Sequence, residues 1–317
     1  MPRLFLTASE KENIHVIDGR TRHRNGVLLE IKIGNERLEV ERSIPLSHEG
    51  DIAMDGHHKL NGGVVVNGLL YAATYGAVVE IDLLTGRQEI KVTSPLFNDL
   101  HHVAFNGDCF AVVNSGLEVI SYYDKEWGHI ADDNLLERFG FDKTFCSQTD
   151  YRYVWSTKPH CIHPNHITFH EGEWWVTRFI QKDFIGLKSG KRFSVEDLGN
   201  PHDGVLRSGG IYLTTTNGKI VRFDINSGER RVWDITSLLG CSEPIGWCRG
   251  VEIIGGRAYV CFTKFRGSKT KEMMKWVVGI RNTLPSQIVE IDLLEARVIG
   301  CYELAIEDLT LFNIFAK

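Results

Sequence analysis

Apolar and polar residues alternate along most of the chain in short runs, and these runs come in pairs separated by tight turns. The clearest pair is CIHPNHITFHEGEWWVTRF at 161–179, where a polar cluster leads into a strand, Gly172 makes a turn and an aromatic strand follows. The same order recurs at 61–74, 100–114, 201–216 and 248–263. Five copies of one signature indicate a repeat architecture built from strands.

The spacing of the copies predicts four-stranded units. The first strands of the pairs open on the apolar residues Val64, Val103, Ile167, Val205 and Val251. Three of the gaps between them are about 40 residues, which is the period of a β-propeller blade. A third strand ending in an acidic turn follows at 78–88, 219–230 and 287–297, and a fourth, outer strand follows at 89–92 and 231–234.

The two ends of the chain are expected to share one blade. Residues 4–8, 27–33 and 38–44 supply three strands, and TLFNIFA at 310–316 supplies the missing inner strand. We therefore predict an all-β, six-bladed β-propeller, a single domain over 1–317, closed by a C-terminal strand that completes blade one.

The two longer gaps must carry insertions, which we place at about 124–160 and 264–285. Within the second, Met273, Met274, Val277 and Val278 fit a short amphipathic helix. Long loops on a rigid scaffold often cover a binding site, but a structural flap or an oligomer contact is an equal alternative, and the oligomeric state stays open.

Composition narrows the class of protein. A net charge of -5 and a pI near 6.2 argue against a nucleic-acid partner. The first residues lack the apolar core of a signal peptide, and no run is long enough to span a bilayer, so we expect no membrane partner. The seven cysteines form no CxxC pair, and a reducing, cytoplasmic location without a disulfide framework is the simplest expectation.

Most of the 13 histidines gather in a few segments at the starts of the inner strands. The two residues before each aligned apolar position, with their neighbours, include His57, His58, Asn98, Asp99, His101, His102, His160, His163, Asn165, His166, His202, Asp203, Arg249 and Asn313. In a propeller these positions face the mouth of the central channel. A single histidine is often a satisfied core residue, but imidazoles converging from three blades with Asn and Asp beside them suit a divalent metal.

These segments resemble the site of the gluconolactonase/SMP-30 family, whose NHL-like blades match the strand pattern described above. The matching text is FND at 97–99, HPNHI at 163–167 and PHDGV at 201–205. The resemblance implies Asn165 and Asp203 as metal ligands and Asn98 in the substrate pocket. The family's N-terminal Glu ligand has no counterpart, since Phe312 and Asn313 stand there. The surrounding histidines favour Zn or Fe over Ca, with His101 and His166 as further ligands.

Other chemistry rests on single residues. Arg249 and Arg178 are candidates to orient a substrate carboxylate, although Arg178 has Asp183 as an alternative surface partner. Cys248 beside Arg249 is either a nucleophile or, more simply, a buried thiol. At least one of Trp174 and Trp175 is expected to pack between blades.

The predicted function is a metal-dependent enzyme acting on a small molecule at the channel mouth, with lactone or ester hydrolysis as the leading reaction. The metal polarises a carbonyl or activates water, and His102, His202 or Arg249 serves catalysis. The substrate-binding residues are expected to be His58, Asn98, His163, Arg178 and Asn313. The alternatives are a metal-dependent lyase, cyclase or oxygenase, and a propeller that binds a ligand or partner without turnover.

Overall fold

The structure is a computed structural model that describes residues 3–11, 22–34, 37–47, 57–265, 284–306 and 308–316. Its strands form six four-stranded antiparallel sheets, each built mainly from strands consecutive in the chain, as in the blades of a β-propeller. The prediction of an all-β, six-bladed propeller is therefore confirmed. The chain divides into two compact units, residues 1–43 with 202–317 and residues 44–201, and each contains three of the sheets.

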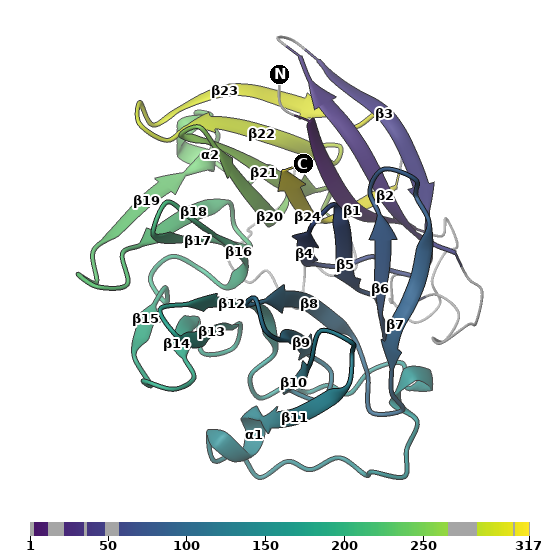
Figure 1. The fold of residues 1–317 in the computed structure, drawn as a ribbon. Helices are drawn as coiled ribbons and strands as arrows, with labels where there is room; N and C mark the ends of the chain where they lie inside the picture. Colours follow the sequence, from purple (N-terminus) through teal and green to yellow (C-terminus); the bar gives the residue numbers. More distant parts are fainter. Residues whose placement is uncertain are drawn as a thin grey trace. The chain divides into compact units, whose positions relative to one another are not determined.

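The first unit holds the sheet in which the two ends of the chain meet (Figure 1). That sheet runs in the order β24 (Leu309–Ala316), β1 (Arg3–Lys11), β2 (His23–Ile33) and β3 (Leu38–Pro45). The second sheet contains β16 (Pro201–Arg207), β17 (Gly210–Thr215), β18 (Lys219–Phe223) and β19 (Arg230–Asp234), which leads into α2 (Ile235–Leu238). The third contains β20 (Trp247–Ile254), β21 (Arg257–Thr263), β22 (Gln287–Asp292) and β23 (Arg297–Glu303).

The second unit holds the remaining three sheets. The first comprises β4 (Gly63–Val66), β5 (Leu69–Ala73), β6 (Ala77–Asp82) and β7 (Gln88–Thr93). The next comprises β8 (Leu100–Phe105), β9 (Phe110–Asn114), β10 (Val119–Tyr123) and β11 (His129–Asn134), followed by α1 (Leu135–Arg138) and η1 (Tyr151–Tyr153). The last comprises β12 (Pro164–His170), β13 (Glu173–Arg178), β14 (Asp183–Gly186) and β15 (Arg192–Ser194).

The C-terminal strand completes the first sheet as predicted. β24 pairs antiparallel with β1, placing Leu6 opposite Ile314 and Thr7 opposite Asn313. Both strands are buried over most of their length, and Leu6, Leu311 and Ile314 pack in one apolar cluster, so the C-terminal strand belongs to the hydrophobic core of its unit.

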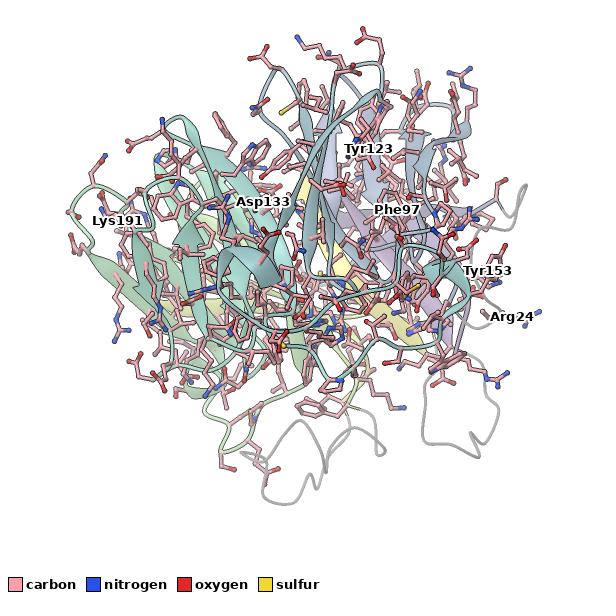
Figure 2. All side chains as sticks on the ribbon, turned by 90° about the horizontal axis from the view of Figure 1, so that it is seen from below. Arg24, Phe97, Tyr123, Asp133, Tyr153 and Lys191 are labelled. Carbon is pink, nitrogen blue, oxygen red and sulfur yellow. The ribbon has the colours of Figure 1, made fainter. Side chains whose placement is uncertain are left out.

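Each unit is held together by apolar clusters between neighbouring sheets. In the second unit one cluster joins β5 and β6 to β8, β9 and β10 through Val78, Phe97, Val103 and Phe110. Figure 2 shows Phe97 within this packed interior, whereas Tyr153 is 49% exposed. Trp175 is buried against Phe184 and Phe193 of its own sheet.

The predicted insertions differ from the observed elements in detail. Segment 124–160 begins with β11, the outer strand of its sheet, and only its later part leaves the sheet. The strand HIADDN carries no apolar alternation because nearly all of it is exposed. The helix expected within 264–285 lies outside the described residues. Within the described ranges no helix has the length and apolar character needed to cross a membrane.

Candidate functional site

Inner strands in both units are irregular at the residues that precede the aligned apolar positions. In the second unit, β8 breaks register between Leu100 and His102, and β12 breaks it between Pro164 and Ile167. In the first unit, the breaks fall between Cys248 and Val251 and at Phe312. A β-bulge turns side chains away from the ordinary strand alternation. These bulges therefore explain why polar residues can occupy the ends of otherwise apolar strands.

Threonines on the second strands satisfy the displaced backbone. The hydroxyl of Thr177 accepts a hydrogen bond from the His166 amide at 2.9 Å. The hydroxyl of Thr214 accepts one from the Asp203 amide at 3.3 Å, and the hydroxyl of Thr7 accepts one from the Asn313 amide at 3.0 Å. A buried amide without a partner is costly, so these hydroxyls stabilise the irregular strands.

A close group of titratable side chains lies in the second unit. We call Lys59, Asp99, His101, His160 and His163 the Asp99 cluster. The ammonium of Lys59 lies 2.9 Å from Oδ1 of Asp99, and Nδ1 of His101 lies 2.8 Å from the backbone carbonyl oxygen of Asp99. The ring of His163 lies 5.0 Å from that of His101 and 4.6 Å from that of His160.

Burial and charge act in opposite directions on this cluster. Burial raises the pKa of Asp99, but the charges of Lys59, His101 and His163 outweigh it and hold the pKa well below its usual range. Burial lowers the pKa of His160, and Lys143 and Lys158 act in the same direction, while Glu118 and Asp99 oppose them. The cluster at neutral pH thus combines an ionised carboxylate with a neutral imidazole at His160.

The backbone of the cluster is strained at two places. Asp99 has φ 51° and His163 has φ 53°, in the left-handed region that residues other than glycine seldom occupy. Such strain persists only where surrounding contacts enforce it, and it gathers at functional sites. Asp99 and His163 both belong to the Asp99 cluster, so the backbone strain lies within the candidate site.

An aromatic group lies beside the cluster. The ring of His57 stacks on Tyr75 at 4.0 Å and lies 4.2 Å from Trp155, while the Lys59 ammonium sits 5.6 Å from the centre of the Tyr75 ring. The Tyr75 hydroxyl donates to the carbonyl of Val154 at 2.5 Å. Burial raises the pKa of Tyr75, so its hydroxyl stays protonated.

Asn98, predicted to bind substrate, is engaged within the protein. Its amide nitrogen donates to the Tyr75 hydroxyl at 2.7 Å and to the Tyr151 carbonyl at 2.8 Å. A Cβ on Gly116 would overlap the Asn98 side chain, so glycine is needed there. Asn98 therefore ties the segment around Tyr151 to the start of β8.

His102, Asn165 and His166 are buried in the same unit. The rings of His102 and His166 lie 4.4 Å apart. Asn165 is 1% exposed, and its side-chain oxygen has no hydrogen-bond partner within the part of the chain that the structure describes. His58 is half-buried and immediately precedes Lys59.

Arg178 forms an ion pair, but a buried one rather than the surface pair considered from the sequence. Its Nε and Nη2 donate to the two carboxylate oxygens of Asp183 at 2.8 and 2.6 Å. The guanidinium also lies 4.3 Å from the centre of the Phe139 ring. Arg178 is thus committed to holding β13 and β14 together.

The other predicted residues belong to the first unit. Nδ1 of His202 lies 2.7 Å from Oδ2 of Asp203, and the Arg249 guanidinium lies 4.7 Å from the centre of the Phe312 ring. The side-chain oxygen of Asn313 accepts from the Ile314 amide at 2.8 Å. Burial raises the pKa of the Cys248 thiol far above its usual value, which argues against Cys248 as a thiolate nucleophile.

The donors present fit the expected metal only in part. The unpartnered oxygen of buried Asn165 suits a ligand, but among the described residues no three His, Cys, Asp or Glu side chains are grouped so that they could hold a metal ion. The ligand set His101, Asn165, His166 and Asp203 stays a prediction.

Two residues at the site, Lys59 and Glu118, were not predicted from the sequence. Lys59 directly follows the histidine pair 57–58, which was its only sequence signal. Glu118 is a buried carboxylate whose two oxygens contact the backbone before β12, as described below. Nothing in its local sequence marks it out, because its partners are more than 40 positions away.

No protein-family model matches the chain, and no curated protein matches it. Solved structures do. A chain in the crystal structure of a nidogen/laminin complex is 12% identical, with a TM-score of 0.59 over 98% of this chain and 97% of that one. A Bacteroides caccae protein of unknown function is 13% identical, with a TM-score of 0.60 over 100% and 99% of the two chains. Streptogramin B lyase is 11% identical, with a TM-score of 0.53 over 96% and 89%.

These likenesses show a β-propeller fold. At such low identity they carry no residue of the site from one protein to another.

Proposed function

We propose that the protein is an enzyme that acts on a small polar molecule by acid–base chemistry at the Asp99 cluster. One observation carries the proposal: the Lys59–Asp99 ion pair is flanked by the imidazoles of His101 and His163. An ionised carboxylate, an ammonium and two imidazoles together can hold a proton, move it and stabilise negative charge.

Each group has a distinct part in such a reaction. The imidazole of His101 or His163, in its neutral form, would accept a proton from water or substrate, and the return of that proton completes the cycle. The Lys59 ammonium stabilises negative charge that develops on a substrate oxygen. The Asp99 carboxylate holds the Lys59 ammonium in place through their ion pair. The nearby rings of Tyr75, His57 and Trp155 offer an apolar wall for the rest of the molecule.

Cleavage of an ester or lactone is the leading reaction. The resemblance of three short segments to the gluconolactonase/SMP-30 family supports hydrolysis, and a base with an oxyanion partner is what that chemistry needs. The fold-level likeness to streptogramin B lyase keeps elimination as the second reaction, since it needs the same two groups. Two further proposals remain. One is a metal ion held by His101, Asn165, His166 and Asp203, which elemental analysis of the purified protein would test. The other is a cytoplasmic location.

The test compares turnover by matched variants. The protein is offered 4-nitrophenyl acetate, dihydrocoumarin and γ-butyrolactone, with product followed by absorbance and mass spectrometry. Lys59→Met and His101→Asn are expected to lower kcat by roughly 10²- to 10⁴-fold. Lys191→Met, at an exposed lysine labelled in Figure 2, serves as the matched control. Equal turnover by all variants would contradict the assignment.

A ligand- or partner-binding propeller is the second candidate. A chain of similar fold occurs in a complex of nidogen with laminin, which shows that such a fold is found in a protein assembly. In that case the wild type cleaves none of the three compounds, and Lys59→Met and His101→Asn change ligand retention alone.

A further inference from the structure

Glu118 is a fully buried carboxylate in the turn between β9 and β10. Its backbone has φ 61°, so the turn itself is conformationally unusual. Glutamate is seldom buried completely unless its charge is paired or hydrogen-bonded. The surroundings of this side chain must therefore compensate for the loss of water.

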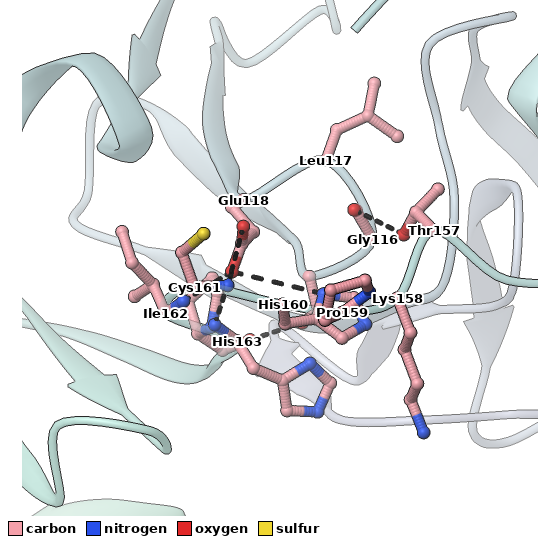
Figure 3. Close-up of polar contacts among 12 residues, drawn as sticks. Gly116, Leu117, Glu118, Thr157, Lys158, Pro159, His160, Cys161, Ile162 and His163 are labelled. Carbon is pink, nitrogen blue, oxygen red and sulfur yellow. Dashed lines mark hydrogen bonds and ion pairs between the residues drawn. The ribbon is translucent and has the colours of Figure 1, made fainter. Parts of the chain in front are cut away.

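The compensation comes from three successive backbone amides. The amides of Cys161, Ile162 and His163 donate to Oε1 of Glu118 at 2.9, 2.5 and 2.8 Å, and the Cys161 amide also lies 3.2 Å from Oε2 (Figure 3). Consecutive amides converging on one anion form a backbone nest. Glu118 thus fixes the chain just where it enters β12.

The opposite side of this segment is fixed as well. The amide of Ile180 donates to the Ile162 carbonyl at 3.1 Å, and the side-chain nitrogen of Gln181 donates to the Cys161 carbonyl at 2.8 Å. Residues 161–163 are therefore held between the Glu118 carboxylate and the turn that follows β13. Little freedom remains for the backbone of His163, which stays in its left-handed conformation.

Glu118 also lies at one end of a row of charged and titratable groups. Nδ1 of His160 and Nζ of Lys143 each lie 4.0 Å from its oxygens. The His160 side chain is 7% exposed, and its Nδ1 has no hydrogen-bond partner among the described residues. The row continues from His160 to His163, His101 and Asp99.

We propose that Glu118 is a positioning residue of the Asp99 cluster, whose carboxylate holds residues 161–163 so that the His163 ring faces His101 and the His160 ring faces His163. This inference rests on the proposed function for its meaning in catalysis. Its geometric part, the placement of two rings by a buried anion, can be tested without a substrate.

The test uses Glu118→Gln, which keeps the shape and removes the charge, and Glu118→Asp, which keeps the charge and withdraws it by one methylene. Glu252→Gln is the matched control, because Glu252 is also buried and accepts a backbone amide, from Ala316 at 3.0 Å, in the other unit. Histidines carrying a ¹³C label are followed by NMR, with assignments from His160→Asn and His163→Asn.

We expect both Glu118 variants to shift the His160 and His163 ring signals while the exposed His129 and the control variant stay unchanged. On any ester or lactone that the wild type cleaves, Glu118→Gln should lower kcat about 10- to 100-fold, with KM nearly unchanged. Unshifted ring signals in a folded variant overturn the proposal. If Glu118→Gln does not fold, the ring signals of Glu118→Asp decide between the same two outcomes.

The two proposals fail separately. If the rings shift but neither Lys59→Met nor His101→Asn affects turnover, the proposed function is wrong and the placement of the rings by Glu118 stands. If Lys59→Met and His101→Asn abolish turnover and the ring signals do not shift in Glu118→Gln or Glu118→Asp, the proposed function stands and the placement of the rings by Glu118 is wrong.

Discussion

The Lys59 ammonium lies 2.9 Å from Oδ1 of Asp99, and the two residues come from loops 40 positions apart in the chain. Each loop precedes the inner strand of a different sheet in the second unit. The ion pair therefore joins neighbouring sheets at the same place where the histidines gather. The Lys59–Asp99 ion pair thus has two roles: it links two sheets, and it supplies the charged groups of the candidate site.

Acid stability should depend on Asp99. Its pKa is depressed in the folded protein, so its stabilising contribution is present above the unfolded pKa of about 3.9 and is lost as the pH falls through the lower, folded value. Asp99→Asn should lower stability at pH 7, and it should make the loss of stability below about pH 4 less steep than in the wild type. Urea unfolding at several pH values measures this, with exposed Asp108→Asn as the control. A decline identical to that of the wild type would contradict the prediction.

The hydroxyl of Thr177 should matter more than its volume. Thr177→Val leaves the His166 amide without its acceptor, which should cost about 1–3 kcal/mol of stability. Thr177→Ser keeps the oxygen and should recover most of that loss. Chemical unfolding of the three proteins decides the matter, and equal stability of the valine and serine variants would argue against the role of the hydroxyl.

The two arginines on Asp183 should differ in their effects. Arg178 is buried, whereas Arg192, which also pairs with Asp183, is 50% exposed. Arg178→Met removes the buried partner of the fully buried Asp183 carboxylate and should lower the free energy of unfolding by about 3–5 kcal/mol. Arg192→Met should lower it by about 1 kcal/mol or less. Thermal or urea unfolding of both variants gives the comparison. Similar losses of stability in the two variants would contradict the prediction that the buried ion pair contributes more than the exposed one.

The seven thiols should react in a defined order. Hydrogen bonding from the Gln148 amide lowers the pKa of exposed Cys146, which should react first with iodoacetamide. Cys248 and Cys261 are buried with raised pKa values and should react only after unfolding. Peptide mass spectrometry after timed alkylation measures the order. Early labelling of Cys248 would show that its surroundings open in the native protein.

The repeat was predictable because its strands obey local rules. Val64, Val103 and Ile167 each lie in an inner strand that a turn folds back, and this pattern is visible without any knowledge of partners. The pairing of β24 with β1 followed from counting strands in the first blade. Strands without alternating apolar residues were not predicted. β11 is an example, because its sequence is acidic and almost wholly exposed.

The site was predictable as a region, but its members were not. The bulged positions could be located because polar residues interrupt a regular strand at His101 and Asn165. Glu118 and Lys59 meet their partners through contacts that span 40 or more positions, and no local pattern encodes such contacts. The prediction for Arg178 named the right partner but placed the pair at the surface, because the cover supplied by Phe139 is a tertiary contact.

The strand pairing between β24 and β1 also bears on how the protein is made. Asn313 hydrogen-bonds to Thr7 across 306 positions, so the first strands leave the ribosome long before their neighbour exists. At synthesis rates of about 5–20 residues per second, β1 waits roughly 15 to 60 seconds with an open edge. During that interval the nascent edge is a template for wrong pairing with other chains. A chaperone that shields the nascent chain should therefore raise the yield of this protein more than its modest size suggests.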